Sequence, residues 1–172
     1  MNKLCALKNL GFKISWNLIA IGLYGNGEIP SSITHLDVVD YLDCLPADID
    51  KQTDNIVALI CEKEDYTKFD RLLKKLASED DSNIVIQERK WRAYLLKTLI
   101  DNINKDSLQG LLELMEFWVS MGKPDNCPQI FPNSSNKKSA QEYFTQESYE
   151  FNLNKNREWL NEEIQSIVNL ES

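Results

Sequence analysis

The sequence predicts an all-α protein of eight or nine helices, arranged as an orthogonal multi-helix bundle or a short α-solenoid-like array. Most segments between turn signals repeat their apolar residues at the spacing of a helix face. Gly and Pro are scarce, at 6 and 5 residues, whereas an all-β sandwich needs frequent tight turns. The one β-like run, at residues 84–86, is too short and isolated to build a sheet. With 172 residues, the chain is expected to form a single helical domain over residues 1–172.

Five helices are expected in the first half of the chain. Their predicted ranges are 2–11, 15–24, 34–45, 54–61 and 65–77. The expected N-cap residues are Ser15, Thr34, Asp54 and, for the fifth helix, Asp65 or Thr67. The inward faces of the last three are expected to bury Val38, Val39, Tyr41, Leu42, Leu45, Ile56, Val57, Leu59, Ile60, Tyr66, Phe69, Leu72, Leu73 and Leu76. The charged segment 78–82 is interpreted as a mobile turn.

Two further helices, at residues 84–103 and 107–121, are predicted to form a central hairpin. The second is apolar around most of its circumference, so it should be surrounded by protein. The first is expected to bury Trp91, Leu95, Leu96, Leu99 and Ile103 and to expose Arg89, Lys90, Arg92 and Lys97. Asp106 is a good N-cap for the second helix. Gly110 costs that helix about 1 kcal/mol relative to Ala, which predicts close approach of a neighbouring helix.

The last part of the chain begins with a connection at residues 122–136 that contains three Pro residues. A connection of this length is either a functional loop or, as we prefer, a strap packed over the core. Ser139 and Glu142 form a capping box that opens a short helix. A second short helix is expected to carry Tyr149 and Phe151, and a last helix is predicted at residues 154–170.

The formal net charge of −8 is concentrated in one segment. Residues 28–65 hold ten acidic side chains and two basic ones, whereas the rest of the chain is balanced. An acidic sector of this kind repels nucleic acid and anionic membranes and attracts basic proteins, so we expect a basic protein partner, no nucleic acid and no membrane. A merely solvated surface is the alternative. The expected partner-binding residues are Asp37, Asp40, Asp43, Asp48, Asp50, Asp54, Tyr41, Glu62, Glu64 and Asp65, with Trp16 and Tyr66 as further aromatic anchors.

No catalytic, cofactor or metal site is predicted. The glycine-containing stretch 22–27 lacks the Lys-Ser/Thr ending of a phosphate-binding loop, and no strand precedes it. The one histidine, His35, has no assignable nucleophile or metal ligand and is expected to be exposed or capping. The cysteines are widely separated and are expected to be buried, reduced thiols: Cys5, Cys44, Cys61 and Cys127. The apolar run 14–24 is too short to span a membrane and no cleavage site follows it, so a cytoplasmic location is expected.

Three stretches of the sequence resemble a known family. They are Ser15-Trp16-Asn17, Lys90-Trp91-Arg92-Ala93-Tyr94-Leu95-Leu96, and Met115-Glu116-Phe117-Trp118 with the following Gly122-Lys123-Pro124-Asp125-Asn126-Cys127-Pro128. In these stretches the chain is similar to a family of small helical bacterial proteins of unknown function, grouped with proposed immunity proteins of polymorphic toxin loci. The family's usual Tyr-Pro at the connection is Lys123-Pro124 here. The resemblance implies a non-enzymatic protein that binds and blocks one cognate toxin.

The resemblance and the charge point in the same direction. Toxin domains that act on nucleic acid are commonly basic, and an acidic inhibitor can compete for their substrate-binding face. The leading hypothesis is therefore an immunity protein that neutralises a basic toxin domain through its acidic face. The alternatives are a helical scaffold that binds a peptide or subunit in an apolar groove and, third, an unrecognised enzyme.

Overall fold

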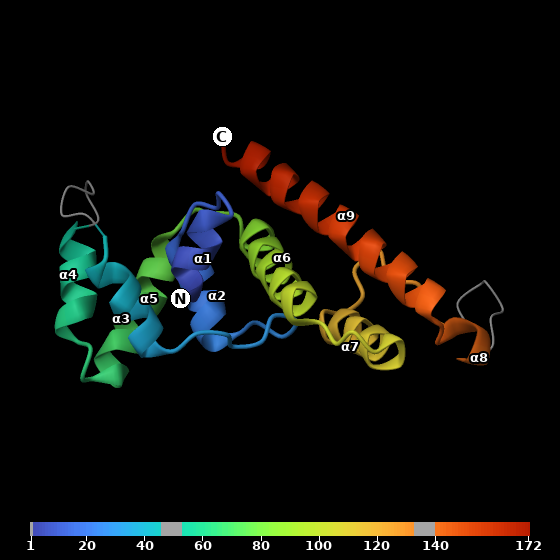
Figure 1. Ribbon diagram of the computed structural model, residues 1–172. Coiled ribbons are helices and arrows are strands. Elements are labelled where there is room, and N and C mark those ends of the chain that lie inside the picture. Colours follow the sequence, from blue (N-terminus) through green and yellow to red (C-terminus); the bar gives the residue numbers. More distant parts are fainter. Residues whose placement is uncertain (1, 46–52, 133–139) are drawn as a thin grey trace. The chain divides into compact units, whose positions relative to one another are not determined.

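In the computed structural model, residues 2–45, 53–132 and 140–172 are described, apart from the side chains of residues 53 and 140. Over these ranges the chain forms nine α-helices and no strand (Figure 1). The helices are α1 (Lys3–Asn9), α2 (Trp16–Tyr24), α3 (His35–Asp43), α4 (Thr53–Cys61), α5 (Tyr66–Glu79), α6 (Ile84–Asn102), α7 (Ser107–Ser120), α8 (Ala140–Tyr143) and α9 (Gln146–Leu170). The all-α prediction is confirmed, and the β-like run 84–86 forms the first turn of α6.

Most predicted helix starts are confirmed by the side chains that cap them. Ser15 accepts a hydrogen bond from the backbone N–H of Leu18, and Asp106 accepts one from that of Gln109. Thr34 and Asp37 form a reciprocal capping box at the start of α3. Asp65 caps α5. Because α4 begins at residue 53, Asp54 lies in its first turn and is not the N-cap that we expected.

The prediction of two separate helices near the end of the chain is wrong, because α9 is one helix of 25 residues. The asparagines at 152, 154 and 156 do not interrupt it, although Asn can compete with the helix for backbone hydrogen bonds. In the structure the side-chain amides of Asn152 and Asn156 donate to the carbonyls of Ser148 and Asn152, one turn earlier, at 2.8 Å each. The polar groups are satisfied within the helix, which therefore continues. The predicted cap at Ser139 lies outside the described residues.

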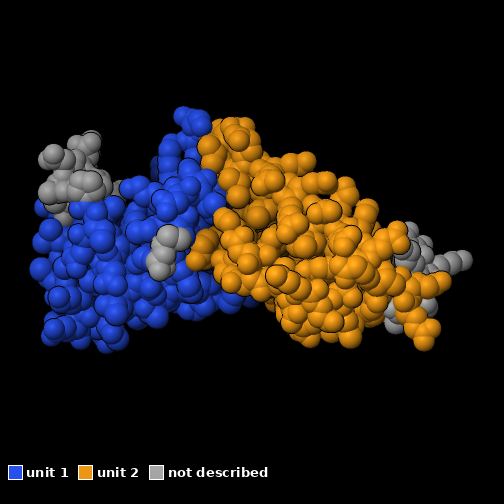
Figure 2. All heavy atoms as spheres, viewed as in Figure 1, with its two compact units in different colours: residues 1–91, 170–172 blue, residues 92–169 orange. Residues whose placement is uncertain are grey.

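The described residues group into two compact units, Met1–Trp91 with Leu170–Ser172 and Arg92–Asn169, and the division falls inside α6 (Figure 2). In the first unit α2 packs on α5, α1 on α3, and α4 on both α3 and α5. Trp91 is fully buried and its indole N–H donates to the carbonyl oxygen of Leu18 at 2.8 Å. A Cβ on Gly22 would lie 2.2 Å from the Trp91 ring, so α2 passes the indole at a position without a side chain. The single domain expected from chain length stays a prediction.

The second unit is organised around the contact of α7 with α9. Trp118 is fully buried, donates to Asn156 Oδ1 at 2.6 Å and meets Trp159 edge to face at a centroid distance of 5.0 Å. A Cβ on Gly110 would lie 2.4 Å from Tyr149, which confirms the predicted close approach of a neighbouring helix. The connection before α8 packs as a strap in its described part. There the buried Gln129 bonds both Tyr143 and Asn156.

Several burial predictions are corrected by the structure. Lys90 and Arg92 are buried, although we expected both to face solvent. The apolar side chains of Val57, Tyr66, Leu108, Val119 and Phe151 are exposed, so α7 is covered on one face only. We expected the four cysteines to be buried thiols. All four are free thiols, but Cys44 and Cys61 are exposed and Cys5 and Cys127 are partly exposed. The segment 78–82 is held by Asn17 at the start of α2, whose backbone N–H donates to Asp80 at 2.8 Å. We predicted a mobile turn because the local sequence does not show this long-range hydrogen bond to Asn17.

Candidate acidic docking site

An acidic pocket opens in the first unit between α3 and the connection from α4 to α5. Its volume is about 290 Å³. The lining residues are His35, Leu36, Val39, Asp40, Asp43, Lys63, Glu64 and Tyr66. Three of them carry carboxylates and one carries an ammonium group. The pocket therefore brings part of the acidic sector together in space, although Asp40 and Glu64 are 24 positions apart in the chain.

The helical geometry of α3 places two of these carboxylates side by side. Asp40 and Asp43 are three residues apart, so both project from the same face of the helix, and both are exposed. Glu64 and Lys63 come from the turn that follows α4, and both are exposed as well. No ion pair joins Lys63 to a carboxylate among the described residues. The acidic side chains thus meet solvent as a cluster with excess negative charge.

Two exposed apolar side chains lie among these charges. Leu36 on α3 is 64% exposed and Tyr66 at the start of α5 is 56% exposed. Leaving large apolar side chains in solvent stabilises nothing, and exposed apolar residues that share a pocket with charged ones are typical of a protein-binding surface. Val39 forms the buried floor.

His35 anchors the pocket to the core of the unit. Its ring stacks on Tyr66 at a centroid distance of 4.2 Å with 11° between the planes, and Phe69 meets it edge-on at 5.2 Å. Its Nε2 forms a hydrogen bond with Asp70 Oδ1 at 2.7 Å, and the Tyr24 hydroxyl donates to the same oxygen at 2.7 Å. The position of the Tyr66 ring is therefore set by α2, α3 and α5 together.

The electrostatics of this anchor keep Asp70 ionised. Partial burial opposes its charge, but hydrogen bonds from Tyr24 and His35 outweigh that effect and lower the pKa of the carboxyl group. The pKa of Tyr24 is raised, first by burial and then by its hydrogen bond to Asp70, so the phenol remains a donor. Lys74 lies over the Tyr24 ring at 4.8 Å.

The structure separates the predicted partner-binding residues into groups. Asp40, Asp43 and Glu64 line the pocket. Three others serve the fold: Asp37 closes the capping box of α3, while Glu62 and Asp65 form ion pairs with Lys68 at 3.7 and 3.2 Å. Asp54 is exposed on α4 and does not line the pocket. Asp48 and Asp50 lie outside the described residues.

Tyr41 and Trp16, which we expected as aromatic anchors of this face, are both buried. Tyr41 lies on the inward face of α3, where the apolar periodicity of the helix places it. Charge counting alone missed Leu36 and His35 as members of the site. An apolar residue on the polar face of an acidic helix was the available signal for Leu36.

The described parts of the chain contain no group of three or more His, Cys, Asp or Glu side chains that could hold a metal ion. None of the helices in the described ranges combines the length and apolar character that a membrane crossing requires. The predicted cytoplasmic location and the absence of an enzymatic activity stay predictions.

Comparison with known protein families identifies a match over most of the chain. The model of a family described as "Uncharacterized protein conserved in bacteria (DUF2247)" matches residues 5–164, which include both compact units almost completely. Comparisons with curated proteins and with solved structures gave no match.

Proposed function

This chain belongs to the DUF2247 family of proteins conserved in bacteria, and we propose that it is a non-enzymatic immunity protein that binds a basic toxin domain through its acidic pocket. The observation that carries the proposal is a pocket lined by three exposed carboxylates together with two exposed apolar side chains. Asp40, Asp43 and Glu64 supply the charge, and Leu36 and Tyr66 supply the apolar contact area.

The pocket suits an arginine or lysine side chain of the partner. A guanidinium group can form paired hydrogen bonds with a carboxylate and can also stack on an aromatic ring. The exposed Tyr66 ring lines the pocket together with the carboxylates, so both kinds of contact are available to one inserted side chain. His35 and Asp70 hold that ring in place, which lowers the entropic cost of binding.

The charge of the pocket would also set the rate of association. Complementary charges steer two proteins together and raise the association rate by roughly 10- to 1,000-fold, an effect that falls steeply with salt. For a protein that must neutralise a toxin before it acts, a fast encounter is as important as a tight complex. A basic substrate-binding face on the toxin would be blocked by the same contact.

The test begins with capture of the partner from the native host and its identification by mass spectrometry. Association kinetics are then measured for the triple variant Asp40→Lys, Asp43→Lys and Glu64→Lys. Asp37 is left unchanged because its replacement would remove the cap of α3. We expect the association rate to fall at least about tenfold and to lose most of its dependence on salt.

The matched control reverses three exposed acids of the second unit, in Glu116→Lys, Asp125→Lys and Glu162→Lys. It changes the net charge equally and should slow association much less. Equal effects of the two triple variants would show that only net charge matters and would reject the pocket as the binding site. An acidic partner, or a triple variant with an unchanged association rate, would reject the proposal itself.

A further inference from the structure

The acidic pocket contains one side chain that can change its charge near neutral pH. His35 lines the pocket and its side chain is 23% exposed, so water reaches the imidazole ring. It is the only histidine in the chain. Histidine is the side chain whose charge ordinarily changes between about pH 5 and pH 8. The charge of the pocket therefore depends on pH in a range where its carboxylates stay ionised.

The hydrogen bonds around Asp70 show where the neutral ring carries its proton. The Tyr24 hydroxyl and Nε2 of His35 each lie 2.7 Å from Oδ1 of Asp70. The lowered pKa of Asp70 keeps this carboxyl group ionised, so it can only accept hydrogen bonds. Nε2 therefore donates to Asp70, and a proton taken up in mild acid goes to the other ring nitrogen, Nδ1.

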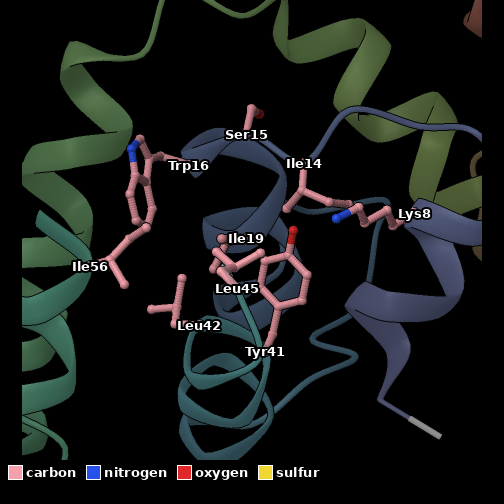
Figure 3. Close-up of a pocket in the computed structure, with 9 residues that line it drawn as sticks. All are labelled: Lys8, Ile14, Ser15, Trp16, Ile19, Tyr41, Leu42, Leu45 and Ile56. Carbon is pink, nitrogen blue, oxygen red and sulfur yellow. The ribbon is translucent and has the colours of Figure 1, made fainter. Parts of the chain in front are cut away.

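The helix that carries His35 is held in place on its other face. Tyr41 and Leu42 are buried there, and Figure 3 shows them around the same space as Ile19 of α2 and Ile56 of α4. A helix packed in this way does not rotate easily, because rotation would bring its apolar face into solvent. Protonation of His35 thus changes the charge of the pocket rather than the position of α3.

The charged and titratable groups around the ring come from three helices and one turn of the first unit. They are Tyr24 of α2, Asp37, Asp40 and Asp43 of α3, Lys63 and Glu64 of the turn after α4, and Tyr66, Asp70 and Lys74 of α5. The helices α1 and α4, which also pack on α3, contribute no titratable side chain to the described lining. Three carboxylates and one ammonium group give that lining a charge of −2, and protonation of His35 reduces it to −1.

The same proton affects the aromatic surface of the pocket. His35 covers one face of the Tyr66 ring at 4.2 Å, and Tyr66 is 56% exposed, so the other face is open to solvent. A partner cation stacked on the open face would lie about 8 Å from the imidazole. Once the imidazole is charged, the two like charges repel across the ring, which weakens binding by roughly threefold or more.

We propose that His35 makes docking at the acidic pocket dependent on pH: the neutral imidazole allows a basic side chain of the partner to bind, and the protonated imidazole weakens that binding. The inference rests on the proposed function, since it concerns the same pocket and the same basic partner. It adds a form of regulation, in which the complex is tightest at neutral pH and loosens in mild acid.

The first measurement follows the titration of His35 in the full chain. Because the chain has one histidine, the imidazole signals in a proton–carbon NMR spectrum belong to His35 without further assignment. We expect them to shift as the pH falls from about 8 to about 5.5, and we expect the ring signals of Tyr66 to shift with the same midpoint. Histidine signals that do not move over this range would overturn the proposal.

The second measurement is the affinity for acetylated hexa-arginine amide, determined by isothermal titration calorimetry at low salt. The charge of this probe does not change with pH, because arginine stays protonated. We expect the native protein to bind it roughly threefold or more weakly at about pH 5.5 than at about pH 7.5. His35→Gln keeps a donor toward Asp70, and His35→Phe keeps a ring against Tyr66. Both should bind with nearly equal affinity at the two pH values.

A permanently charged variant tests the opposite state. His35→Arg places a planar cation that can stack on Tyr66 and pair with Asp70, so it should bind the probe weakly at both pH values. The matched control is Asn161→Arg, which adds the same charge at an exposed position of the second unit. It should keep the pH dependence of the native protein.

The outcomes separate this proposal from the proposed function. Equal affinity of the native protein at the two pH values, or a pH dependence that persists in both His35→Gln and His35→Phe, would overturn the regulation by His35. The docking site itself would still stand if the triple variant Asp40→Lys, Asp43→Lys and Glu64→Lys loses the probe. A triple variant that binds the probe as tightly as the native protein at neutral pH would instead reject the pocket, and the proposed function with it.

Discussion

The ammonium group of Lys90 is buried in the first unit, with the side chain 0% exposed. It donates to the Lys13 carbonyl oxygen at 2.7 Å, to Gln87 Oε1 at 2.9 Å and to Glu171 Oε1 at 2.5 Å. Glu171 supplies the charge that compensates it. We predict that Glu171→Gln destabilises the first unit more than Lys90→Met does, although both variants remove the same ion pair.

The asymmetry follows from what each substitution leaves behind. Glu171→Gln leaves an ammonium group in the interior with neutral acceptors only, and uncompensated buried charges cost about 3–5 kcal/mol. We expect the lower end, about 3 kcal/mol, because the new amide oxygen can still accept a hydrogen bond. Lys90→Met removes the buried charge itself. It leaves the Lys13 carbonyl, the buried Gln87 amide oxygen and the partly exposed Glu171 carboxylate without this donor, for a cost of about 1–2 kcal/mol.

Urea denaturation measures both effects. The free energy of unfolding is followed by the fluorescence of the tryptophans, and the double variant completes a cycle in which Glu171→Gln should cost little once Lys90 is Met. Asp101→Asn is the control, since it breaks the exposed pair with Lys97 and should cost less than about 0.5 kcal/mol. A cost below about 1 kcal/mol for Glu171→Gln, or a larger cost for Lys90→Met, would refute the reasoning.

The pair of Lys90 and Glu171 should also affect how the stability of the protein depends on pH. Burial lowers the pKa of Lys90 from its ordinary value of 10.5, although the hydrogen bond that Lys90 donates to Glu171 opposes the shift. Between the lowered pKa and 10.5 the unfolded chain binds more protons than the folded one, so this group makes stability rise with pH in that window. The stability difference between the native protein and Lys90→Met should therefore increase across the same window. A flat difference would show that Lys90 titrates normally.

Two further predictions concern close packing and a capping carboxylate. Gly110→Ala should destabilise the protein by about 1–3 kcal/mol, measured by urea denaturation, because the added carbon would overlap Tyr149. On an open helix the same substitution would stabilise by about 1 kcal/mol. A stabilised variant would therefore contradict the contact between Gly110 and Tyr149. Asp80→Asn should cost about 1 kcal/mol at neutral pH, discounted for partial exposure, because Asp80 accepts from the backbone N–H groups of Asn17 and Ser82. Burial opposes the charge of Asp80, but these hydrogen bonds lower its pKa below 3.8, so the stabilisation should vanish as pH falls from about 4 through that lowered pKa. A cost that persists in acid would point to a role other than the charge.

The sequence by itself determined the helices, because their signals are local. Apolar spacing placed the cores of α3, α5, α6 and α7, and short polar side chains marked four helix starts. The cost of Gly110 to helix stability was by itself enough to predict a close contact with a neighbouring helix. Local signals did not predict that α9 is one continuous helix, in which Asn152 and Asn156 find acceptors one turn earlier.

The candidate site was predictable only in part. Counting charges located the acidic sector, but it treated Asp40 and Asp37 alike. The tertiary structure shows that the two have different roles. Asp37 forms hydrogen bonds in the capping box of α3, whereas Asp40 lines a pocket with Glu64. Periodicity did assign Tyr41 correctly to the inward face of α3.

Lys90 shows the physical reason for this division. Its neighbours in the chain predict a solvated lysine, and its buried position depends on a carboxylate 81 residues away. Helix propensity, capping and amphipathic spacing act within a few residues, so the sequence alone determines the helical class and most of the helix positions. Desolvation of a charge, and the pockets left between helices, depend on segments distant in the chain, and only the tertiary structure decided those.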